Sequence, residues 1–390
     1  MLHHLLKFLE VAFALGALAG VGYYLLCVGS ALSFQRFWRR ETLRFQDGRS
    51  LHQPQVSILK PLRGTDPDIY ESFRSHCLQD YPDYELIFGI SDPRDPAVIL
   101  VERLMKEFPQ RRIRLIVCPV SLGTNLKVSN LVQMLPHARF DHLIVNDSDI
   151  RVDRRYLSRV MAPLADPEVG MVTCLYRGIA GRTLASRLES LGISTDFCPG
   201  VLAARTLEGI RFGLGSTLAF PRRALQAIGG FETLVDYLSD DFQLGARIAH
   251  AGYKVVLSDE IVDHHLPDYS VGGYVQHQMR WARGTRDSRR WGYAGLVLTF
   301  GLPWSLLALG LSNFSWWAWS LLALVLGMRL AVAAVVGLGV LGDRQLWRDF
   351  PLIPLRDLSA LLVWVASFTG HTVAWRGHQF VLEKGKLRPA

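Results

Sequence analysis

Two carboxylates, Asp147 and Asp149, flank Ser148 directly after a short apolar run, Leu143–Val145. The run has the composition of a buried β-strand, and the acidic pair would follow its carboxyl end, where open α/β sheets bind ligands. Two carboxylates at positions i and i+2 can hold a hard cation such as Mg²⁺ or Mn²⁺ and leave coordination positions open for a diphosphate. The spacing therefore predicts a divalent-metal site, with an acidic turn as the alternative.

Other acids occur before and after this pair. Asp92 follows a second predicted strand, and parallel strands end at one edge of a sheet, so Asp92 should lie near the acidic pair. The alternative for Asp92-Pro93 is an ordinary turn. A second acidic pair, Asp240 and Asp241, begins a helical segment and is a further candidate for the site. The alternative for this second pair is that it only complements the helix dipole.

Arg280 and Trp281 lie together on a predicted helix. A guanidinium can donate a fork of hydrogen bonds to phosphate oxygens, and an indole offers an apolar face to a sugar or a lipid. The alternatives are a membrane-facing basic cluster and an interfacial anchor. Residues 263–265, Asp-His-His, contain metal-ligand types, but we interpret them as a solvated or core-packed loop.

The elements that must position these side chains alternate between strand and helix. Strands are predicted at 56–59, 85–91, 113–118, 143–145, 169–175 and 253–257. Helices are predicted at 68–79, 96–108, 125–134, 236–250 and 274–290. This order predicts an α/β fold with a mostly parallel, doubly wound sheet. Residues 213–220 are rich in small side chains and suit close backbone approach, whereas residues 178–212 give no clear pattern.

The composition adds a membrane to this picture. Of the 390 residues, 49% are hydrophobic, and the formal net charge is +8. Segments 11–34 and 292–312 carry no charge, 315–340 carries only Arg329, and 358–374 is apolar apart from one histidine. Each is long enough to span a bilayer. The five cysteines are odd in number and include no CxxC pair, which indicates a reducing compartment and argues against a zinc motif.

Basic clusters follow the first apolar segment and precede the next, which is typical of the cytoplasmic face of a membrane rather than of a nucleic-acid surface. We therefore predict an anchor whose amino end is outside, with residue 36 onward in the cytoplasm. Counting crossings puts the carboxyl end outside, whereas its basic residues, among them Arg376 and Arg388, favour the inside. A re-entrant or interfacial last segment would resolve this conflict. The predicted regions are a membrane anchor at 1–35, a basic linker at 36–53, an α/β domain at 54–290, about three membrane segments at 291–376 and a basic tail at 377–390.

The order Asp92, Asp147-Ser-Asp149, Asp240-Asp241 and His277-Gln-Met-Arg280-Trp281 resembles family 2-type inverting glycosyltransferases, whose pattern is D, DxD, (E/D)D and (Q/R)xxRW. More narrowly it is similar to family 21, the ceramide glucosyltransferases and their bacterial relatives, through residues 56–61, 125–131 and 149–152. Among these it looks most like the hopanoid-biosynthesis-associated glycosyltransferases, through residues 88–93, 172–177 and the histidine at 277. That histidine departs from the (Q/R) position, and the acidic pair is Asp-Asp rather than Glu-Asp.

The resemblance implies a cytoplasmic GT-A-like, Rossmann-type domain with a mixed sheet, next to transmembrane helices. It implies that Asp149, with Asp147, holds Mn²⁺ or Mg²⁺, and that Asp241 is the general base beside Asp240. The other implied roles are nucleotide binding by Asp92 and Asp147, charge neutralisation near the nucleotide by Lys127, and binding of the diphosphate and of sugar or lipid by Arg280 and Trp281.

The implied activity is transfer of one sugar, with inversion, from a UDP-sugar to a lipid hydroxyl at a bacterial inner membrane. The resemblance favours UDP-N-acetylglucosamine as the donor and bacteriohopanetetrol as the acceptor. The first alternative is a ceramide glucosyltransferase that uses UDP-glucose. A processive polysaccharide synthase would need more spanning helices for its channel, and a non-catalytic lipid-binding protein would not need the four motifs. Nucleic acid is not expected as a partner.

Overall fold

A computed structural model describes residues 1–46, 52–375 and 378–389. The chain forms two compact units, each assembled from separate stretches of sequence. The helical unit comprises Met1–Phe37, Arg182–Leu207 and Asp268–Lys384, and the sheet unit comprises Trp38–Gly181, Glu208–Pro267 and Gly385–Ala390. Because the two units interleave within residues 54–290, the predicted single domain over that range stays a prediction. Arg49 and Arg376, two members of the predicted basic clusters, lie outside the described residues.

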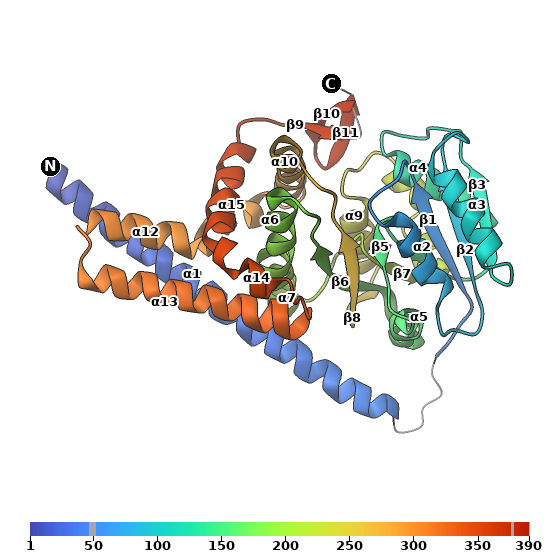
Figure 1. Cartoon of the computed structure of the whole chain (residues 1–390), viewed down its shortest axis with the longest axis horizontal. Coiled ribbons are helices and arrows are strands. Elements are labelled where there is room, and N and C mark those ends of the chain that lie inside the picture. The colour runs from blue at the N-terminus through green and yellow to red at the C-terminus, as the bar shows by residue number, and fades with distance from the viewer. Residues whose placement is uncertain (47–51, 376–377, 390) are drawn as a thin grey trace. The chain divides into compact units, whose positions relative to one another are not determined.

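The sheet unit contains a mixed eight-stranded sheet in the order β3-β2-β1-β4-β7-β6-β8-β5 (Figure 1). Its strands are β1 (Val56–Leu62), β2 (Tyr84–Ile90), β3 (Arg112–Val117), β4 (His142–Val145), β5 (Ile150–Arg151), β6 (Val169–Ile179), β7 (Leu218–Pro221) and β8 (Lys254–His265). The first four strands in the sheet order are parallel, and β7 is antiparallel to both of its neighbours. The carboxyl ends of β1, β2 and β4 therefore lie along one edge, as the sequence predicted.

Six helices of the sheet unit accompany these strands. They are α2 (Ile69–Cys77), α3 (Ala97–Glu107), α4 (Leu126–Met134), α5 (Tyr156–Met161), α8 (Arg222–Ala227) and α9 (Asp240–His250). Helix α4 begins where the Asn125 side chain accepts a hydrogen bond from the Val128 amide, which satisfies one of the amides left unpaired at a helix start. Apolar side chains of α4, α8 and α9 then pack against β1, β2 and β4 in one buried core. This packing fixes the helix starts at the sheet edge.

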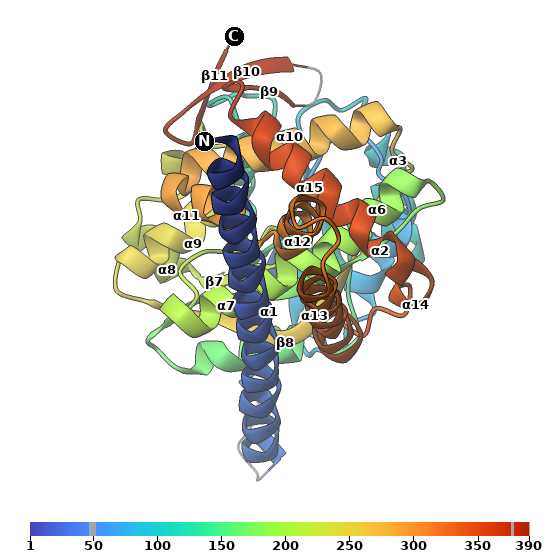
Figure 2. The same cartoon turned by 90° about the vertical axis from the view of Figure 1, so that its left-hand side faces the viewer.

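Helix α1 (Leu2–Gln46) is longer than the predicted anchor and continues through the basic residues that follow it. The other helices of the helical unit are α6 (Leu184–Gly192), α7 (Cys198–Glu208), α10 (Val271–Ser288), α11 (Arg290–Gly295), α12 (Gly301–Leu311), α13 (Trp316–Val332), α14 (Leu346–Asp349) and α15 (Ile353–Ser367). Helices α12 and α13 run antiparallel beside α1 (Figures 1 and 2). Helices α1 and α12 approach closely, because a Cβ at Gly20 would lie 2.5 Å from the Cα of Gly301.

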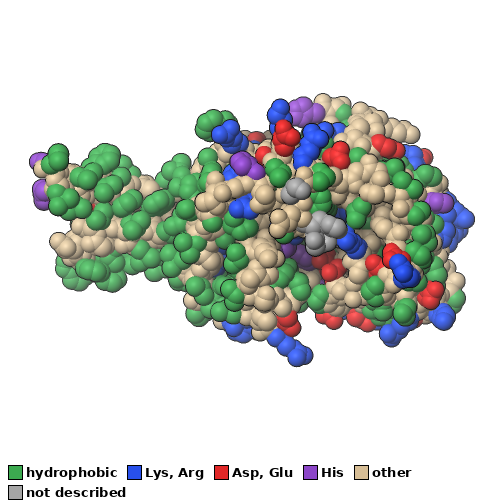
Figure 3. Space-filling model, turned by 90° about the horizontal axis from the view of Figure 1, so that it is seen from above, with side chains coloured by type: hydrophobic (Ala, Val, Ile, Leu, Met, Phe, Trp, Pro, Cys, Tyr) green, Lys and Arg blue, Asp and Glu red, His purple; other side chains and the backbone are tan. Residues whose placement is uncertain are grey.

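Three helices of the described chain are long and apolar enough to cross a membrane, at Leu2–Glu41, Trp316–Val340 and Leu346–Ser367. A fourth candidate is the pair Arg290–Thr299 and Gly301–Leu311, which is bent by 49°. In Figure 3, hydrophobic side chains cover the part of the helical unit that holds α1, α12 and α13. These observations support the predicted membrane association.

The last apolar segment differs from the prediction. Helix α15 ends at Ser367, and β9 (Thr372–Trp375) pairs with β10 (His378–Glu383) where the sequence predicted the end of a span and a basic tail. A turn follows in which Lys384 and Gly385 both have positive φ, of 51° and 81°. Strand β11 (Lys386–Pro389) then belongs to the sheet unit. The apolar side chains of these short strands alternate with polar and basic ones, so the sequence did not predict strands here.

Candidate functional site

The predicted acidic pair lies in the short connection between β4 and β5. Asn146, which is buried, donates from its side-chain amide to the Ser216 carbonyl at 2.7 Å and to the Tyr156 hydroxyl at 3.0 Å. The Asp147 amide donates to the Gly215 carbonyl at 3.3 Å. These bonds tie the acidic connection to the segment before β7, so the carboxylates are held at the sheet edge.

Lys127 joins the two acidic pairs that the sequence could only place separately. Its ammonium lies 2.7 Å from a carboxylate oxygen of Asp147 and 3.1 Å from one of Asp240. Burial alone would lower the pKa of Lys127, but the charges of Asp147, Asp240 and Asp241 outweigh burial and raise it. Lys127 is therefore a cation at any physiological pH. Asn125 also donates to Asp240, at 3.3 Å, so the start of α4 meets the start of α9.

Asp241 lies next to this cluster and is held by two backbone amides. One carboxylate oxygen accepts from the Gly215 amide at 2.8 Å, and the other accepts from the Phe242 amide at 2.7 Å. Burial, reinforced by the charge of Asp240, raises the pKa of Asp241 to about 6. A carboxylate with such a pKa is ionised at neutral pH and still basic enough to take a proton from a hydroxyl in a transition state.

Glycine is required at the point where the two acidic pairs approach each other. A Cβ at Gly215 would lie 2.7 Å from a carboxylate oxygen of Asp147 and 3.3 Å from one of Asp241. A second close approach lies beside it, because a Cβ at Gly245 on α9 would lie 2.1 Å from the amide nitrogen of Gly213. Helix α9 thus packs directly on the backbone that carries Gly215.

Asp149 points to a different set of partners. One of its oxygens lies 3.0 Å from the Nε2 atom of His264, and the other is buried without a hydrogen-bond partner among the described residues. Burial alone would raise the pKa of Asp149, but the His264 ring outweighs burial and lowers it. The expectation that residues 263–265 form a loop was wrong, since His264 lies on β8.

The buried Asp149 oxygen tests whether a cation fits here. An orphaned carboxylate oxygen is costly to bury, and carboxylate oxygens are the ligands that Mg²⁺ and Mn²⁺ prefer. Within the described ranges, no group of three or more His, Cys, Asp or Glu side chains is arranged to hold a metal. The buried Asp149 oxygen is thus a carboxylate ligand that suits such a cation, whereas a carboxylate oxygen of Asp147 lies against Lys127.

Two further residues of the site were not predicted from the sequence. Lys60, at the carboxyl end of β1, is fully buried and donates from its ammonium to the Asp147 carbonyl at 3.1 Å. Burial lowers the pKa of Lys60 to about 7, although Asp149 and Asp147 oppose the shift. Asp66 accepts from the Ser148 hydroxyl at 2.7 Å. Lys60 lies within β1 and Asp66 follows that strand, and their place near its carboxyl end was the only available signal.

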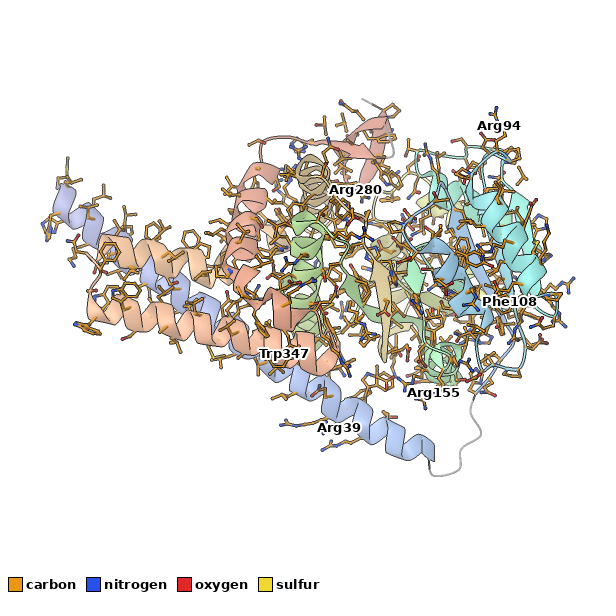
Figure 4. The ribbon with its side chains drawn as sticks, in the orientation of Figure 1. Arg39, Arg94, Phe108, Arg155, Arg280 and Trp347 are labelled. Carbon is orange, nitrogen blue, oxygen red and sulfur yellow. The ribbon has the colours of Figure 1, made fainter. Side chains whose placement is uncertain are left out.

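Asp92 lies at the same edge, after β2, with β1 between that strand and β4. Its side chain is 53% exposed and lies 3.2 Å from the Arg94 guanidinium. Hydrogen bonds from Arg94 lower the pKa of Asp92. Figure 4 labels Arg94 on this exposed loop. The structure therefore keeps Asp92 ionised and open to solvent.

Arg280 and Trp281 lie on α10 in the helical unit, whereas the acids and Lys127 lie in the sheet unit (Figure 4). The Arg280 guanidinium lies 3.1 Å from the Nδ1 atom of His277. The His277 ring packs against Trp281, with the ring centroids 5.4 Å apart, and its other nitrogen lies 3.5 Å from the buried Glu189 carboxylate. His277 thus contacts both Arg280 and Trp281, and a histidine at this position can hold these two side chains together.

A family model described as glycosyl transferase family 21 matches residues 14–388. Ceramide glucosyltransferase 3 of Caenorhabditis elegans is 26% identical over 255 residues, which are 65% of this chain and 54% of that protein. Ceramide glucosyltransferase 1 of the same organism is 21% identical over 352 residues, 85% of this chain and 72% of that protein. The chain thus spans about half the length of the first of these relatives and nearly three quarters of the second.

A mannosyltransferase from Pyrobaculum calidifontis, solved in complex with GDP-Man and Mn²⁺, is similar in structure with a TM-score of 0.50. It is 20% identical in sequence, and the match covers 90% of this chain and 99% of that one. This likeness concerns the fold. Together with the mixed eight-stranded sheet, it confirms the predicted GT-A-like α/β fold.

Proposed function

Because this chain belongs to glycosyl transferase family 21, we propose that it transfers one sugar, with inversion, from a UDP-sugar to the hydroxyl of a membrane lipid. The observation that carries the proposal is the position of Lys127 between Asp147 and Asp240. It joins the pair suited to a metal-bound diphosphate to the pair suited to a general base. Both halves of a glycosyl transfer can therefore act on one bound donor.

In the proposed reaction, Asp241 takes the proton of the acceptor hydroxyl while the hydroxyl oxygen bonds to the anomeric carbon. The bond from that carbon to the diphosphate breaks, and UDP leaves with the electron pair. Attack on the side opposite the leaving diphosphate inverts the anomeric centre, through a transition state with oxocarbenium character. The two amides that hold Asp241 keep it oriented without any further movement.

The leaving diphosphate gains negative charge that must be balanced. A divalent cation held by Asp149 and Asp147 supplies Lewis acidity for that charge when it is bound. Arg280 would donate to the diphosphate, Trp281 would cover the sugar or lipid, and Asp92 would bind the uridine. Lys127 fixes Asp147 and Asp240 and offsets their mutual repulsion.

Two donor and acceptor pairs are compatible with this chemistry. The sequence resemblance favours UDP-N-acetylglucosamine with bacteriohopanetetrol. The names of the two nematode relatives favour UDP-glucose with ceramide. We rank the hopanoid pair first, because the resemblance at residues 88–93 and at His277 is the narrower one. We place the reaction at the cytoplasmic face of a bacterial inner membrane.

The test is an assay of purified protein with each UDP-sugar and an equimolar mixture of bacteriohopanetetrol and ceramide in detergent. Mass spectrometry identifies the glycolipid, and NMR of its anomeric proton reports the configuration. A product of inverted configuration that is lost in Asp241→Asn supports the proposal. Exclusive glucosylation of ceramide reverses our ranking of acceptors, and a product with retained configuration rules out the proposed mechanism.

A further inference from the structure

Helix α15 exposes an apolar stripe along one side. Leu355, Leu358, Leu362 and Val365 recur at helical spacing, and Leu362 is 70% exposed. The neighbouring Arg356 and Asp357 are buried instead. A helix that buries its charges and exposes its leucines has the reverse of the pattern expected next to water. The exposed stripe therefore needs an apolar partner.

The buried charges hold α15 to the rest of the helical unit. Arg329 on α13 is 1% exposed and donates to Asp357 at 2.7 Å and to Asp196 at 3.0 Å. Arg356 lies 3.3 Å from the other carboxylate oxygen of Asp196. Breaking a buried ion pair by removing one partner costs roughly 3–5 kcal/mol. The polar face of α15 is thus fixed inward, and the leucine stripe is fixed outward.

The other end of α15 is tied to α10 and α11. Arg286 donates to the Gly370 carbonyl at 2.7 Å and also to the Ser367 carbonyl. The Tyr293 hydroxyl donates to the Ser367 hydroxyl at 3.0 Å. Figures 1 and 2 both show α15 crossing the direction of α12 and α13 rather than running alongside them. Helix α15 is therefore held across the direction of those two helices.

The path of the chain limits how often it can cross a membrane between the two ends of the helical unit. The chain leaves the sheet unit at Pro267 and returns to it at Gly385. The return is structural, because the Leu387 amide donates to the Asp236 carbonyl at 2.7 Å. Both ends of the intervening segment therefore lie on the side of the sheet unit. The number of crossings between them must be even.

The bent pair Arg290–Thr299 and Gly301–Leu311, taken as one span, and helix α13 together supply an even number of crossings. Helices α12 and α13 are antiparallel and joined by a tight turn in which Asn313 and Phe314 have positive φ, so the chain goes out and comes back. A single further crossing by α15 would leave the chain on the wrong side. The candidate span Leu346–Ser367 reaches 22 residues only by joining α14 and a 3-10 turn at Phe350–Leu352 to α15. Helix α15 by itself has 15 residues and is about 22 Å long, which is shorter than the roughly 30 Å hydrocarbon core.

We propose that α15 lies in the plane of the membrane, in the leaflet on the side of the sheet unit, with its leucine stripe against the acyl chains. This surface binds lipid rather than a protein partner, because the helices packed beside it, α12 and α13, are themselves apolar and exposed. The arrangement removes the conflict between the crossing count and the basic carboxyl end. It also holds α10, which carries Arg280, at the level of the lipid headgroups.

The first test measures depth in vesicles of phosphatidylcholine and phosphatidylglycerol that contain the full-length protein. The five native cysteines are buried, so a spin label attaches at single introduced cysteines. Labels at Leu355 and Val365 are compared with labels at Trp317 and Leu330 on α13. Ten residues of a spanning helix would separate the first two labels in depth by about 15 Å.

We expect the two α15 labels to lie at the same depth within a few ångströms and the two α13 labels to differ strongly. A depth difference near 15 Å between the α15 labels overturns the proposal.

The second test measures sidedness with a membrane-impermeant maleimide in intact and opened vesicles. Cysteines are introduced at the exposed positions Arg344 and Arg388, on either side of α15, with His3 and Arg94 as markers for the amino end and the sheet unit. We expect the labels at 344, 388 and 94 to share one side and the label at 3 to lie on the other. Labels at 344 and 388 on opposite sides would show that α15 crosses, and would overturn the proposal whether or not the enzyme is active.

Discussion

Replacing Asp241 by asparagine should lower turnover strongly but lower stability only at acidic pH. Burial beside Asp240 raises the pKa of Asp241 from its ordinary value of 3.8 to about 6. Between these values the folded protein binds more protons than the unfolded chain, so stability falls as pH rises through this window. At pH 8 the ionised carboxylate therefore lowers the free energy of unfolding by about 3 kcal/mol.

Asparagine removes that cost but introduces another. Both oxygens of Asp241 accept from backbone amides, those of Gly215 and Phe242. An asparagine side chain can accept at only one of them, and an unpaired buried amide costs about 1–3 kcal/mol. The two terms nearly cancel at pH 8. At pH 5 the carboxyl group of the native protein is mostly protonated, and its hydroxyl oxygen still accepts, so the penalty of the native carboxyl group falls to about 1.6 kcal/mol. About 1.4 kcal/mol of the cost of the asparagine is then no longer offset.

The assay follows apparent Tm and turnover for the native protein and for Asp241→Asn. We expect equal Tm at pH 8 and a Tm about 2 °C lower for the variant at pH 5. Turnover should fall about 100-fold or more, the usual cost of losing a general base, which corresponds to about 2.7 kcal/mol in the barrier. Binding of the UDP-sugar, measured by calorimetry, should hardly change. The native pH–rate profile should decline below about pH 6, and this limb should be absent from the residual activity of the variant.

The matched control is Asp240→Asn, which changes the neighbouring carboxylate that contacts Lys127 and should reduce turnover less. A Tm difference that is the same at both pH values would refute the raised pKa. Near-native turnover of Asp241→Asn together with an inactive Asp240→Asn would move the base by one residue. If both variants turned over normally, Asp236 would be the next acid to test.

Three further predictions concern the surroundings of this base. Chelation should abolish transfer, Mn²⁺ or Mg²⁺ should restore it, and Asp149→Ala should remain inactive with either ion; full turnover in excess chelator would contradict the metal role. Lys127→Met leaves Asp147 and Asp240 without their shared cation, so the free energy of unfolding should fall by about 3–5 kcal/mol. Denaturant titration measures this, with Lys106→Met at an exposed position of α3 as the control. An unchanged midpoint for Lys127→Met would contradict the prediction. Removing residues 386–390 withdraws the partner of the Asp236 carbonyl, so hydrogen exchange in the loop before α9 should accelerate while exchange in β1 stays slow; unchanged exchange in that loop would contradict it.

Much of the sheet unit could be predicted from the sequence, because its strands are short apolar runs that end at acidic or proline-containing turns. The predicted strands at 85–91 and 113–118 differ from β2 and β3 by one residue at each end. The order of these elements also indicated that Asp92 and Asp147 share a sheet edge. The direction of β7 was not predictable from the sequence. It is antiparallel to β4 and β6, and only its pairing with those two strands determines its direction.

The site was predictable as a set of acids but not as a set of contacts. No local pattern indicates that Lys127 reaches both Asp147 and Asp240, since that depends on the start of α4 meeting the start of α9. His264 was set aside because its neighbours resemble a polar loop, whereas β8 turns its ring toward Asp149. The contacts Lys127–Asp240 and Asp149–His264 each join residues more than a hundred positions apart. Lys127 and Asp147 are closer in sequence, but the folded sheet unit is needed to bring them together.

Residues 178–212 gave no pattern because their polar side chains have partners elsewhere in the chain. Asp196 is charged yet lies within a helical stretch, and its partner Arg329 is 133 residues away. Sequence periodicity assumes that charged side chains face water. That assumption fails where a charge is buried against a distant opposite charge. For the same reason, the sequence did not indicate that Arg356 and Asp357 lie on the buried face of α15.

The contact of Gly245 with Gly213 limits how this enzyme can diversify. The two backbones touch with no side chain between them, so helix α9 cannot be adjusted by exchanging one residue for a slightly larger or smaller one. Homologues that acquire new substrates must therefore leave this contact intact and vary parts of the chain that do not rest on it. We expect the start of α9, with Asp240 and Asp241, to keep its position in such homologues.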